Sequence, residues 1–433
     1  MIVWSIILLF GSFFLLLALR VPVAFGIGIS TTLTLLLNMP LMPAITTVAQ
    51  RMTTGVDSFS LLAIPLFVLA GDLMNHGGIA KRLIRFAKAL VGSLPGGLAY
   101  VNVLAAMLIG AISGSAMAAA SAIGSVMTGE MEKEGYPRPF SAAVNASAST
   151  TGLLIPPSNV LIVFALASGG TASVAALFMG GYVPGILVGL ALMVVAALQA
   201  RRRGFKRGER ASGSELGRSF LDAILGLFML VLVVGGIVGG IFTATEAAAI
   251  AVLYALALGV GYGEIRFKTM PGILLGSSKT TAVVMFLIGT SMAMSWLFAY
   301  QSLPQMISEV LLSNISSPIL ILLIINLTLL VVGTFMDMTP AVLIFTPIFL
   351  PVVVDMGMDP VHFGLIMVLN LCIGLCTPPV GTILFVSSGV ARVSVSQVVK
   401  PLIPFLIAMI VVLMLITYVE PLVMWLPRVF GLA

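Results

Sequence analysis

The chain has 433 residues, 60% of them hydrophobic and only 8% charged, and its mean hydropathy is +1.20. Because soluble domains carry about 25% charged residues, this composition excludes a soluble protein and predicts an integral membrane protein with many helical spans. The net charge of +6 lies mainly in loops, above all in RRRGFKRGER. It therefore indicates the orientation of the loops rather than binding to nucleic acid.

The first elements are three predicted spans and one surface helix. The opening stretch MIVWSIILLFGSFFLLLAL has no basic segment before it and no small-residue cleavage site, so we expect a retained helix rather than a signal peptide. Arg20 ends this span, which places the N-terminus outside if basic clusters are cytoplasmic. Further spans are expected at 22–38 and 58–74. The amphipathic stretch GGIAKRLIRFAKAL then predicts an arm helix along the cytoplasmic surface.

The next two apolar segments depart from simple spans. The segment at about 100–128 has basic residues before it and after it, which places both of its ends on the cytoplasmic side of the membrane. It therefore predicts a re-entrant helical hairpin buried in protein. The segment at about 141–168 contains Pro156-Pro157. Since proline lacks an N–H and disfavours helix in the residue before it, we expect a helix broken near its middle. A span at about 174–200 returns to a basic linker at 201–218.

The second half repeats this order. Spans are expected at about 219–241, 245–262 and 281–300, followed by a second hairpin at about 318–354. A second broken helix at about 360–390 contains Pro378-Pro379, and a last span is expected at about 404–424.

An internal duplication explains the recurrence. Pro378 follows Pro156 by 222 positions, and two glycine pairs keep the same offset: Gly152 with Gly374, and Gly135 with Gly357. Counted from the linker, each element of the second copy crosses opposite to its counterpart, and both termini are periplasmic. The predicted fold is an all-α polytopic membrane protein with an inverted-topology repeat, two re-entrant hairpins and two discontinuous helices. Its first repeat covers 1–200, its cytoplasmic linker 201–218 and its second repeat 219–433.

Polar residues gather beside both breaks. They are Ser113, Gly114, Ser115, Asn145, Ser147, Ser149, Thr150, Thr151, Ser158 and Asn159 in the first half, and Asp337, Thr339, Asn370, Thr377 and Thr382 in the second. Broken helices at the membrane midplane expose N–H groups that attract anions and carbonyls that coordinate cations, as in many secondary transporters. Neutral oxygens of this kind suit sodium. The alternative for any single hydroxyl or glycine is ordinary helix packing, but packing gives no reason to break a helix twice.

Other residues have simpler interpretations. A carboxylate in an apolar block is functional by default, although Asp337 also fits a water-exposed hairpin tip. Glu246 lies at a helix start, where capping explains it. Cys372 and Cys376 have no histidine nearby, so a structural role is expected over a metal or redox pair. His76 and His362 fall in polar turns and predict surface roles. The motifs HExxH, GxSxG and GxxxxGK[ST] are absent, so no enzyme and no ATP-driven pump is predicted.

Several long strings carry a family resemblance. GAISGSAMAAASAIGSVMTGEMEKEGYPRPFSAAVNASASTTGLLIPPSN, ALFMGGYVPGILVGLALM, TEAAAIAVLYALALG, GTFMDMTPAVLIFTPIFLPV and CTPPVGTILFVSSG stand in this order. They resemble the large membrane subunit of tripartite ATP-independent periplasmic (TRAP) transporters, over nearly the whole chain. The resemblance implies a bacterial inner-membrane subunit that works with a small four-helix membrane subunit and a periplasmic substrate-binding protein.

The resemblance also implies an activity and a site. Members import carboxylate-bearing solutes, such as C4-dicarboxylates, sialic acid or keto sugar acids, together with sodium, and their fold is similar to that of elevator-type transporters. The sodium sites are expected at hairpin tips facing breaks, from Ser113, Gly114, Thr151, Gly152 and Pro156 in the first half and Thr339, Gly374 and Pro378 in the second, partly through backbone carbonyls. Substrate is expected between the tips, with Ser115, Asn145, Ser149, Asp337, Asn370 and Thr377 in reach.

One departure from the family leaves the substrate open. Family hairpin tips often continue in a hydroxyl run after Ser-Gly-Ser, whereas Ala116 and Met117 follow here. The small subunit fused to the N-terminus of some members is absent, so a separate partner is expected. Two alternatives to the sodium-coupled importer stay open: an anion or proton exchanger that needs no binding protein, and a membrane scaffold without transport of its own.

Overall fold

The computed structural model describes residues 2–205, 208, 210–315 and 317–432. Within these residues it contains twenty α-helices and two short 3-10 helices, and it contains no β-strand. Lys206, Arg207 and Glu209 of the predicted linker lie outside the described residues, as do Met1, Ser316 and Ala433, which fall within the two predicted repeats. The fold class is therefore the predicted one, an all-α protein.

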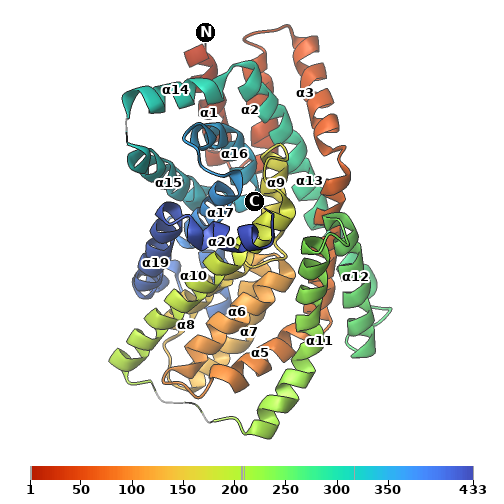
Figure 1. The fold of residues 1–433 in the computed structure, drawn as a ribbon, viewed down its shortest axis with the longest axis vertical. Helices are drawn as coiled ribbons and strands as arrows, with labels where there is room; N and C mark the ends of the chain where they lie inside the picture. The colour runs from red at the N-terminus through yellow and green to blue at the C-terminus, as the bar shows by residue number, and fades with distance from the viewer. Residues whose placement is uncertain (1, 206–207, 209, 316, 433) are drawn as a thin grey trace.

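The first half runs from α1 to α10 (Figure 1). Its helices are α1 (Ile2–Ala18), α2 (Val23–Leu35), α3 (Leu41–Val56), η1 (Phe59–Leu62), α4 (Ala63–His76), α5 (Ile79–Val91), α6 (Gly97–Ser113), α7 (Ala116–Lys133), α8 (Arg138–Ser149), η2 (Thr151–Leu153), α9 (Asn159–Ala167) and α10 (Val174–Arg203). The predicted hairpin is α6 with α7, and the predicted broken helix is α8, η2 and α9.

The second half runs from α11 to α20. Its helices are α11 (Gly213–Val238), α12 (Ala244–Gly261), α13 (Met270–Tyr300), α14 (Leu303–Asn314), α15 (Pro318–Phe335), α16 (Met338–Asp355), α17 (Pro360–Cys376), α18 (Thr382–Ala391), α19 (Val395–Tyr418) and α20 (Pro421–Val429). Here α15 and α16 form the hairpin, and α17 with α18 forms the broken helix.

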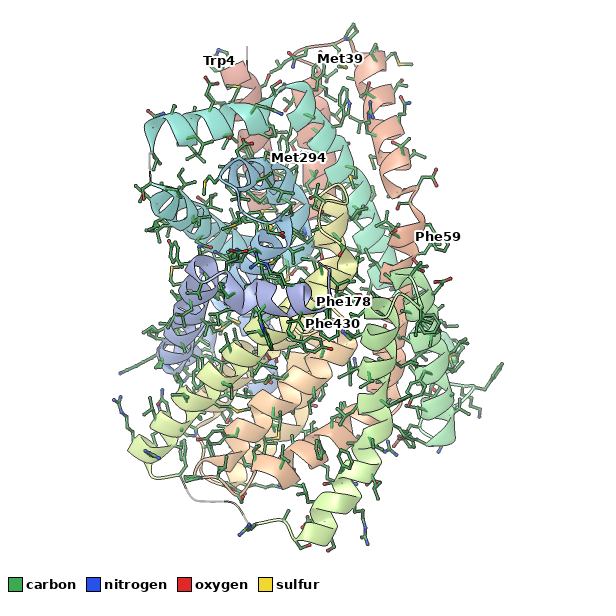
Figure 2. The ribbon with its side chains drawn as sticks, viewed as in Figure 1. Trp4, Met39, Phe59, Phe178, Met294 and Phe430 are labelled. Carbon is green, nitrogen blue, oxygen red and sulfur yellow. The ribbon has the colours of Figure 1, made fainter. Side chains whose placement is uncertain are left out.

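Apolar side chains cover the outside of the protein as well as its core. Figure 2 labels Phe178 and Met294, which are fully buried, and Trp4 and Phe59, whose side chains are 71% and 67% exposed. Eight helices in the described residues are long and apolar enough to cross a membrane. An apolar exterior of this extent fits lipid rather than water, which agrees with the composition.

The helices pack as two groups. One, which we call the wall group, comprises α1 to α5 and α11 to α13; the other, the hairpin group, comprises α6 to α10 and α15 to α20. In Figure 1, α3, α11, α12 and α13 follow one side of the molecule, and α8, α10, α15 and α19 the other. The groups meet where α4 contacts α6 and α9, where α5 contacts α6 and α7, where α11 contacts α6 and α10, and where α13 contacts α16; α14 contacts both α13 and α16.

The two broken helices contact each other inside the hairpin group. Every residue of α17 from Val361 to Cys376 is buried, as is every residue of α8 from Phe140 to Ser149. The Cys372 thiol lies 3.5 Å from the carbonyl oxygen of Thr150, and the Cys376 thiol lies 3.2 Å from that of Ala146. Both cysteines are free thiols that contact the neighbouring helix, which is the structural role predicted for them.

Some sequence predictions are wrong in detail. The sequence predicts no helix at α3 or α14, because both lack the continuous apolar run of a span. The last predicted span, 404–424, is two helices: Val419 leaves helical geometry (φ −115°, ψ 79°), and Glu420 and Pro421 follow it directly. Proline disfavours helix in the residues before it, so the apolar run does not continue as one helix. His362 is not on the surface. It is 3% exposed in the first turn of α17, with Nε2 2.6 Å from the carbonyl oxygen of Ile416.

The prediction for Glu246 is confirmed. Its carboxylate accepts hydrogen bonds from the N–H and the hydroxyl of Thr243, both at 2.8 Å, and the Glu246 N–H donates to the Thr243 hydroxyl. This reciprocal pair is a capping box, and it fixes the start of α12.

Candidate functional site

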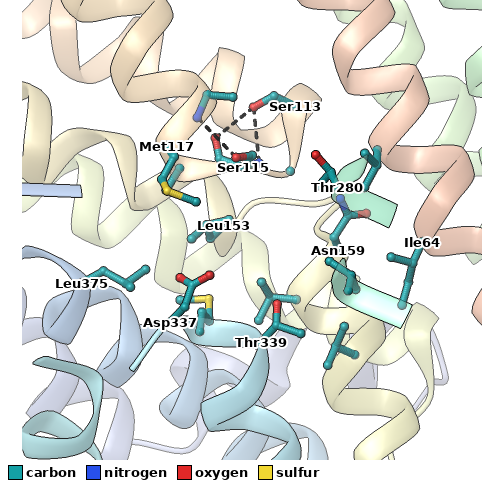
Figure 3. Close-up of a pocket in the computed structure, with 18 of the residues that line it drawn as sticks. Ile64, Ser113, Ser115, Met117, Leu153, Asn159, Thr280, Asp337, Thr339 and Leu375 are labelled. Carbon is teal, nitrogen blue, oxygen red and sulfur yellow. Dashed lines mark hydrogen bonds between the residues drawn. The ribbon is translucent and has the colours of Figure 1, made fainter. Parts of the chain in front are cut away.

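The first hairpin tip is a three-residue reversal, Ser113-Gly114-Ser115. Gly114 has φ +59°, a left-handed conformation that residues with a Cβ rarely adopt, and it ends α6. The Ser115 hydroxyl then caps α7 by accepting the Ala118 N–H at 3.3 Å. The Ser113 hydroxyl lies 3.3 Å from the carbonyl oxygen and 3.4 Å from the amide nitrogen of Ser115 (Figure 3). The polar groups of this tip are thus bonded to one another.

The second tip is acidic. α15 ends at Phe335, Met336 and Asp337 are extended, and α16 begins at Met338. Asp337 occupies the N-cap position, yet its side chain makes no capping hydrogen bond. Figure 3 shows its carboxylate directed into the space below the first tip.

The first break lies wholly inside the protein. All residues from Ser149 to Ser158 are buried, and the Pro156-Pro157 bond is cis. The break's hydroxyls return to carbonyl oxygens of α8: Ser149 to Asn145 at 2.7 Å, Thr150 to Ser147 at 2.8 Å, and Thr151 to Ala148 at 2.7 Å. Such bonds satisfy the hydroxyls locally and leave other backbone groups of the break without helical partners.

The second break is shorter and reaches the surface. The Thr377 hydroxyl donates to the Ile373 carbonyl at 2.7 Å, the Pro378-Pro379 bond is cis, and Pro379 is exposed. The Gly381 N–H donates to the Thr334 carbonyl at 3.2 Å. This bond ties the second break to the end of α15, beside the second tip.

A glycine pair brings each hairpin against its break. A Cβ on Gly152 would lie 2.2 Å from the Gly110 Cα, and a Cβ on Gly374 would lie 2.6 Å from the Gly333 Cα. Neither distance is compatible with a side chain, so both pairs require glycine for backbone contact. α4 also comes close to the first tip, because a Cβ on Gly71 would lie 2.7 Å from the Ser113 carbonyl oxygen.

These elements enclose a cavity of about 280 Å³ between the two tips (Figure 3). One side is formed by the tips and breaks of the hairpin group, and the opposite side by α4 and α13 of the wall group. The lining residues that matter for its chemistry are Asp72, Asn75, Ser113, Gly114, Ser115, Asn159, Thr280, Asp337, Thr339 and Thr382.

The electrostatics of this cavity come from helix ends and two carboxylates. The first turns of α7, α9, α16 and α18 all line it. Helix N-termini carry unsatisfied N–H groups and about half a positive charge each. The N-cap residues of α9, α16 and α18 make no side-chain capping hydrogen bond to these groups. No Lys, Arg or His is among the described residues that line the cavity, whereas Asp72 and Asp337 are. The cavity therefore offers both anion-binding and cation-binding groups.

The structure brings together only part of the predicted site. Ser113, Gly114, Ser115, Asp337 and Thr339 line the cavity, whereas nine predicted residues do not: Asn145, Ser149, Thr151, Gly152, Pro156, Asn370, Thr377, Gly374 and Pro378. Asn145 donates to the Ala120 carbonyl at 2.8 Å and lies 3.3 Å from the Ser387 hydroxyl. Asn370 donates to the backbone and side-chain oxygens of Asn326 at 2.9 and 2.8 Å. The roles predicted for these residues stay predictions.

Sequence reasoning missed the wall of the cavity. Asp72, Asn75 and Thr280 belong to α4 and α13, which have no break to mark them. Asp72 nevertheless carries a signal in the sequence, since it is an acidic residue within a predicted span. Asn159 and Thr382 were recognised as polar residues beside the breaks but not as site residues.

Comparisons with known proteins agree with this architecture. Residues 10–422 match the family model described as the tripartite ATP-independent periplasmic transporter, DctM component. The chain belongs to this family. It is thus a TRAP large permease, a subunit of a secondary transporter, which supports the prediction that the chain is not an enzyme.

Relatives of this DctM component align over most of their length. The chain is 54% identical to the Salmonella typhimurium protein named "Uncharacterized protein YgiK", over 99% of this chain and 98% of the relative. It is 38% identical to the C4-dicarboxylate TRAP transporter large permease of Rhodobacter capsulatus, over 99% and 100%. It is 41% identical to the 2,3-diketo-L-gulonate TRAP transporter large permease of Escherichia coli, over 87% and 88%.

A solved structure has a similar fold. The YdaH transporter of Alcanivorax borkumensis superposes on this DctM component with a TM-score of 0.65, over 87% of this chain and 88% of that chain. The two sequences are 14% identical, so the likeness concerns the fold alone.

Proposed function

We propose that this chain is the large membrane subunit of a sodium-coupled importer of small carboxylate-bearing solutes in the bacterial inner membrane. It works with a small four-helix membrane subunit and a periplasmic substrate-binding protein, and both of its termini are periplasmic. The substrate class matches what the names of two relatives state, a C4-dicarboxylate and 2,3-diketo-L-gulonate.

One observation carries the proposal: four helix N-termini meet at a cavity whose described lining residues include no basic side chain. A carboxylate binds to N–H groups at helix N-termini without needing an arginine or lysine. Because Asp72 and Asp337 place negative charge at the same cavity, binding of an anionic solute there requires a cation to offset the repulsion. Sodium supplies that charge, and its gradient supplies the energy of transport.

The two sodium ions bind where a hairpin tip meets a break. The first site uses Ser113, Gly114, Thr151, Gly152 and Pro156, and the second uses Thr339, Gly374 and Pro378, in each case partly through carbonyl oxygens. The glycine contacts and the bond from Gly381 to Thr334 support this pairing of tip and break. Unwound backbone at membrane depth is tolerated where it lines such a cavity.

Transport follows an elevator mechanism in which the hairpin group moves against the wall group. The position of the cavity between the groups supports this division, since solute held by the hairpin group is released once its tips pass the wall. The two groups are built from an inverted repeat, 1–200 and 219–433. The equivalent hairpins, breaks and glycine pairs of the two halves support this interpretation.

Uptake into proteoliposomes tests the proposal. The chain is reconstituted with its small subunit and a binding protein, and uptake of labelled D-gluconate, succinate and N-acetylneuraminate is measured separately, with and without an inward sodium gradient. We expect uptake of at least one acid that needs both the gradient and the binding protein. Uptake that ignores sodium refutes the coupling, and uptake without any binding protein favours a self-sufficient exchanger. If the reconstituted complex takes up none of the acids, the result favours the alternative of a membrane scaffold without transport of its own.

A further inference from the structure

The wall of the cavity carries a carboxylate held in place by a neighbouring helix. The Asp72 Oδ2 atom of α4 accepts a hydrogen bond from the Ser277 hydroxyl of α13 at 2.6 Å. Ser277 is 4% exposed, and α4 and α13 pack against each other. A hydrogen bond this short to an ionised acceptor is among the stronger kinds, so it fixes the direction of the Asp72 side chain.

The cavity-facing stripe of α4 is divided into two parts. Ile64 and Val68 make one part apolar, whereas Asp72 and Asn75 make the other part polar. α13 continues this division, with Val284 and Thr280 as the apolar and polar residues. The polar part lies beside the first tip, because Gly71 contacts Ser113. A ligand between the tips therefore meets oxygen and amide groups on one part of the wall and methyl groups on the other.

The hydrogen-bonding capacity of this polar part limits the ligand. An ionised carboxylate only accepts hydrogen bonds, while Asn75 and Thr280 both donate and accept. A ligand group that faces Asp72 must therefore supply donors. A hydroxyl satisfies this requirement, whereas a second ligand carboxylate placed there repels Asp72, and no Lys, Arg or His is among the described lining residues to offset the repulsion.

On the basis of the proposed function, we infer that the site takes a hydroxylated monocarboxylate, and that Asp72 is the residue that selects it. The ligand's carboxylate binds among the N-termini of the hairpin group, and its hydroxyls donate to Asp72 on the wall. The negative charge of Asp72 also repels the second carboxylate of a dicarboxylate. One side chain therefore both binds the hydroxyls of the preferred ligand and excludes dicarboxylates. Ser277 acts as a positioning residue because it orients this carboxylate.

Binding of two named acids tests the inference. Titration calorimetry measures the affinity of the purified full chain for D-gluconate and for succinate in sodium buffer, for wild type, Asp72→Asn, Ser277→Ala and the control Asp222→Asn on the exposed surface of α11. We expect wild type to prefer gluconate. Asp72→Asn weakens gluconate and strengthens succinate, so the ratio of the two affinities changes by about tenfold or more. Ser277→Ala shifts the ratio the same way by less, and Asp222→Asn leaves it unchanged.

The outcomes separate the inference from the proposed function. If wild type binds succinate at least as tightly as gluconate, or if Asp72→Asn weakens both acids by one factor, the selective role of Asp72 is overturned while sodium-dependent acid binding stands. If neither acid binds in the presence of sodium, the inference fails, while the uptake assay with N-acetylneuraminate and the complete complex decides the proposed function separately. Thermal unfolding of each variant checks folding, and Ser277→Ala, which keeps the carboxylate, provides the readout if Asp72→Asn unfolds.

Discussion

The two halves place the same elements around one cavity but distribute polarity differently. In the first half the tip hydroxyls bond to their own backbone, and the whole break is buried. In the second half the tip carries Asp337, which does not cap its helix, and the break reaches the surface at Pro379. The comparison teaches that the tip and break of the first half offer a neutral, internally bonded surface, whereas the tip of the second half carries a carboxylate.

The glycine contacts are the feature that the halves share most closely, and breaking them has the largest expected effect. Gly152→Ala places a Cβ 2.2 Å from Gly110, and Gly374→Ala places one 2.6 Å from Gly333. Each variant lowers the free energy of unfolding by about 1–3 kcal/mol or more, as overpacking does, and abolishes uptake. Thermal unfolding in detergent measures the change. Gly389→Ala, whose Cβ meets nothing within 4 Å, is the matched control, and equal effects of all three would refute the packing explanation.

Removing the charge of the second tip has the next largest effect. Asp337→Asn lowers sodium affinity by about tenfold, roughly 1.4 kcal/mol, because the cavity loses one of its two carboxylates. Stability changes by less than about 0.5 kcal/mol, since no capping bond is lost. Sodium titration of the uptake rate measures the effect, with Asp222→Asn as the control. An unchanged sodium dependence would contradict a role for the second tip in ion binding.

For the first tip we expect the opposite result, a larger effect on stability than on sodium affinity. Ser115→Ala removes the cap of α7 and costs about 1 kcal/mol of stability, while sodium affinity falls less than in Asp337→Asn because backbone groups remain. Chemical unfolding and the same sodium titration measure the two quantities, with Ser115→Thr as the variant that restores the cap. If Ser115→Ala spares stability and removes sodium dependence, the two tips do not differ in the way described.

The smallest effects concern the turns that precede the two broken helices. In the second half Asp359 accepts the Val361 N–H at 2.7 Å, and Asp359→Ala costs about 1 kcal/mol.

In the first half Arg138 bonds both carboxylate oxygens of Glu132 and holds the pKa of that carboxyl below its usual range. This stabilisation is present above the ordinary pKa of glutamate and is lost as pH falls through the lowered value. Because the Arg138–Glu132 pair is exposed, Glu132→Gln changes the melting temperature only slightly, and only at pH values above the lowered pKa of Glu132. A large change at neutral pH would contradict this.

The sequence predicts the parts of the site that need unusual residues. Gly114 and the two double prolines mark the tip and the breaks, because few other residues produce these backbone shapes. The wall contributes Asp72, Asn75 and Thr280 from ordinary helices, so only packing shows that they face the same space. Asn145 and Asn370, whose predicted roles stay predictions, show the limit of the sequence: a polar residue beside a break looks the same whether it lines the cavity or bonds to a neighbouring helix, as both do here.

The central claim is that a carboxylate-bearing solute binds in the cavity between the tips and that its binding requires sodium. Met117 lines this cavity and is 43% exposed, whereas Cys372 and Cys376 are fully buried. The rate of maleimide labelling of Met117→Cys therefore reports on the cavity. It is measured with D-gluconate, succinate or N-acetylneuraminate, each with and without sodium. We predict that at least one acid slows labelling strongly when sodium is present and has little effect when it is absent. Labelling that no acid slows, or that an acid slows equally without sodium, would contradict the claim.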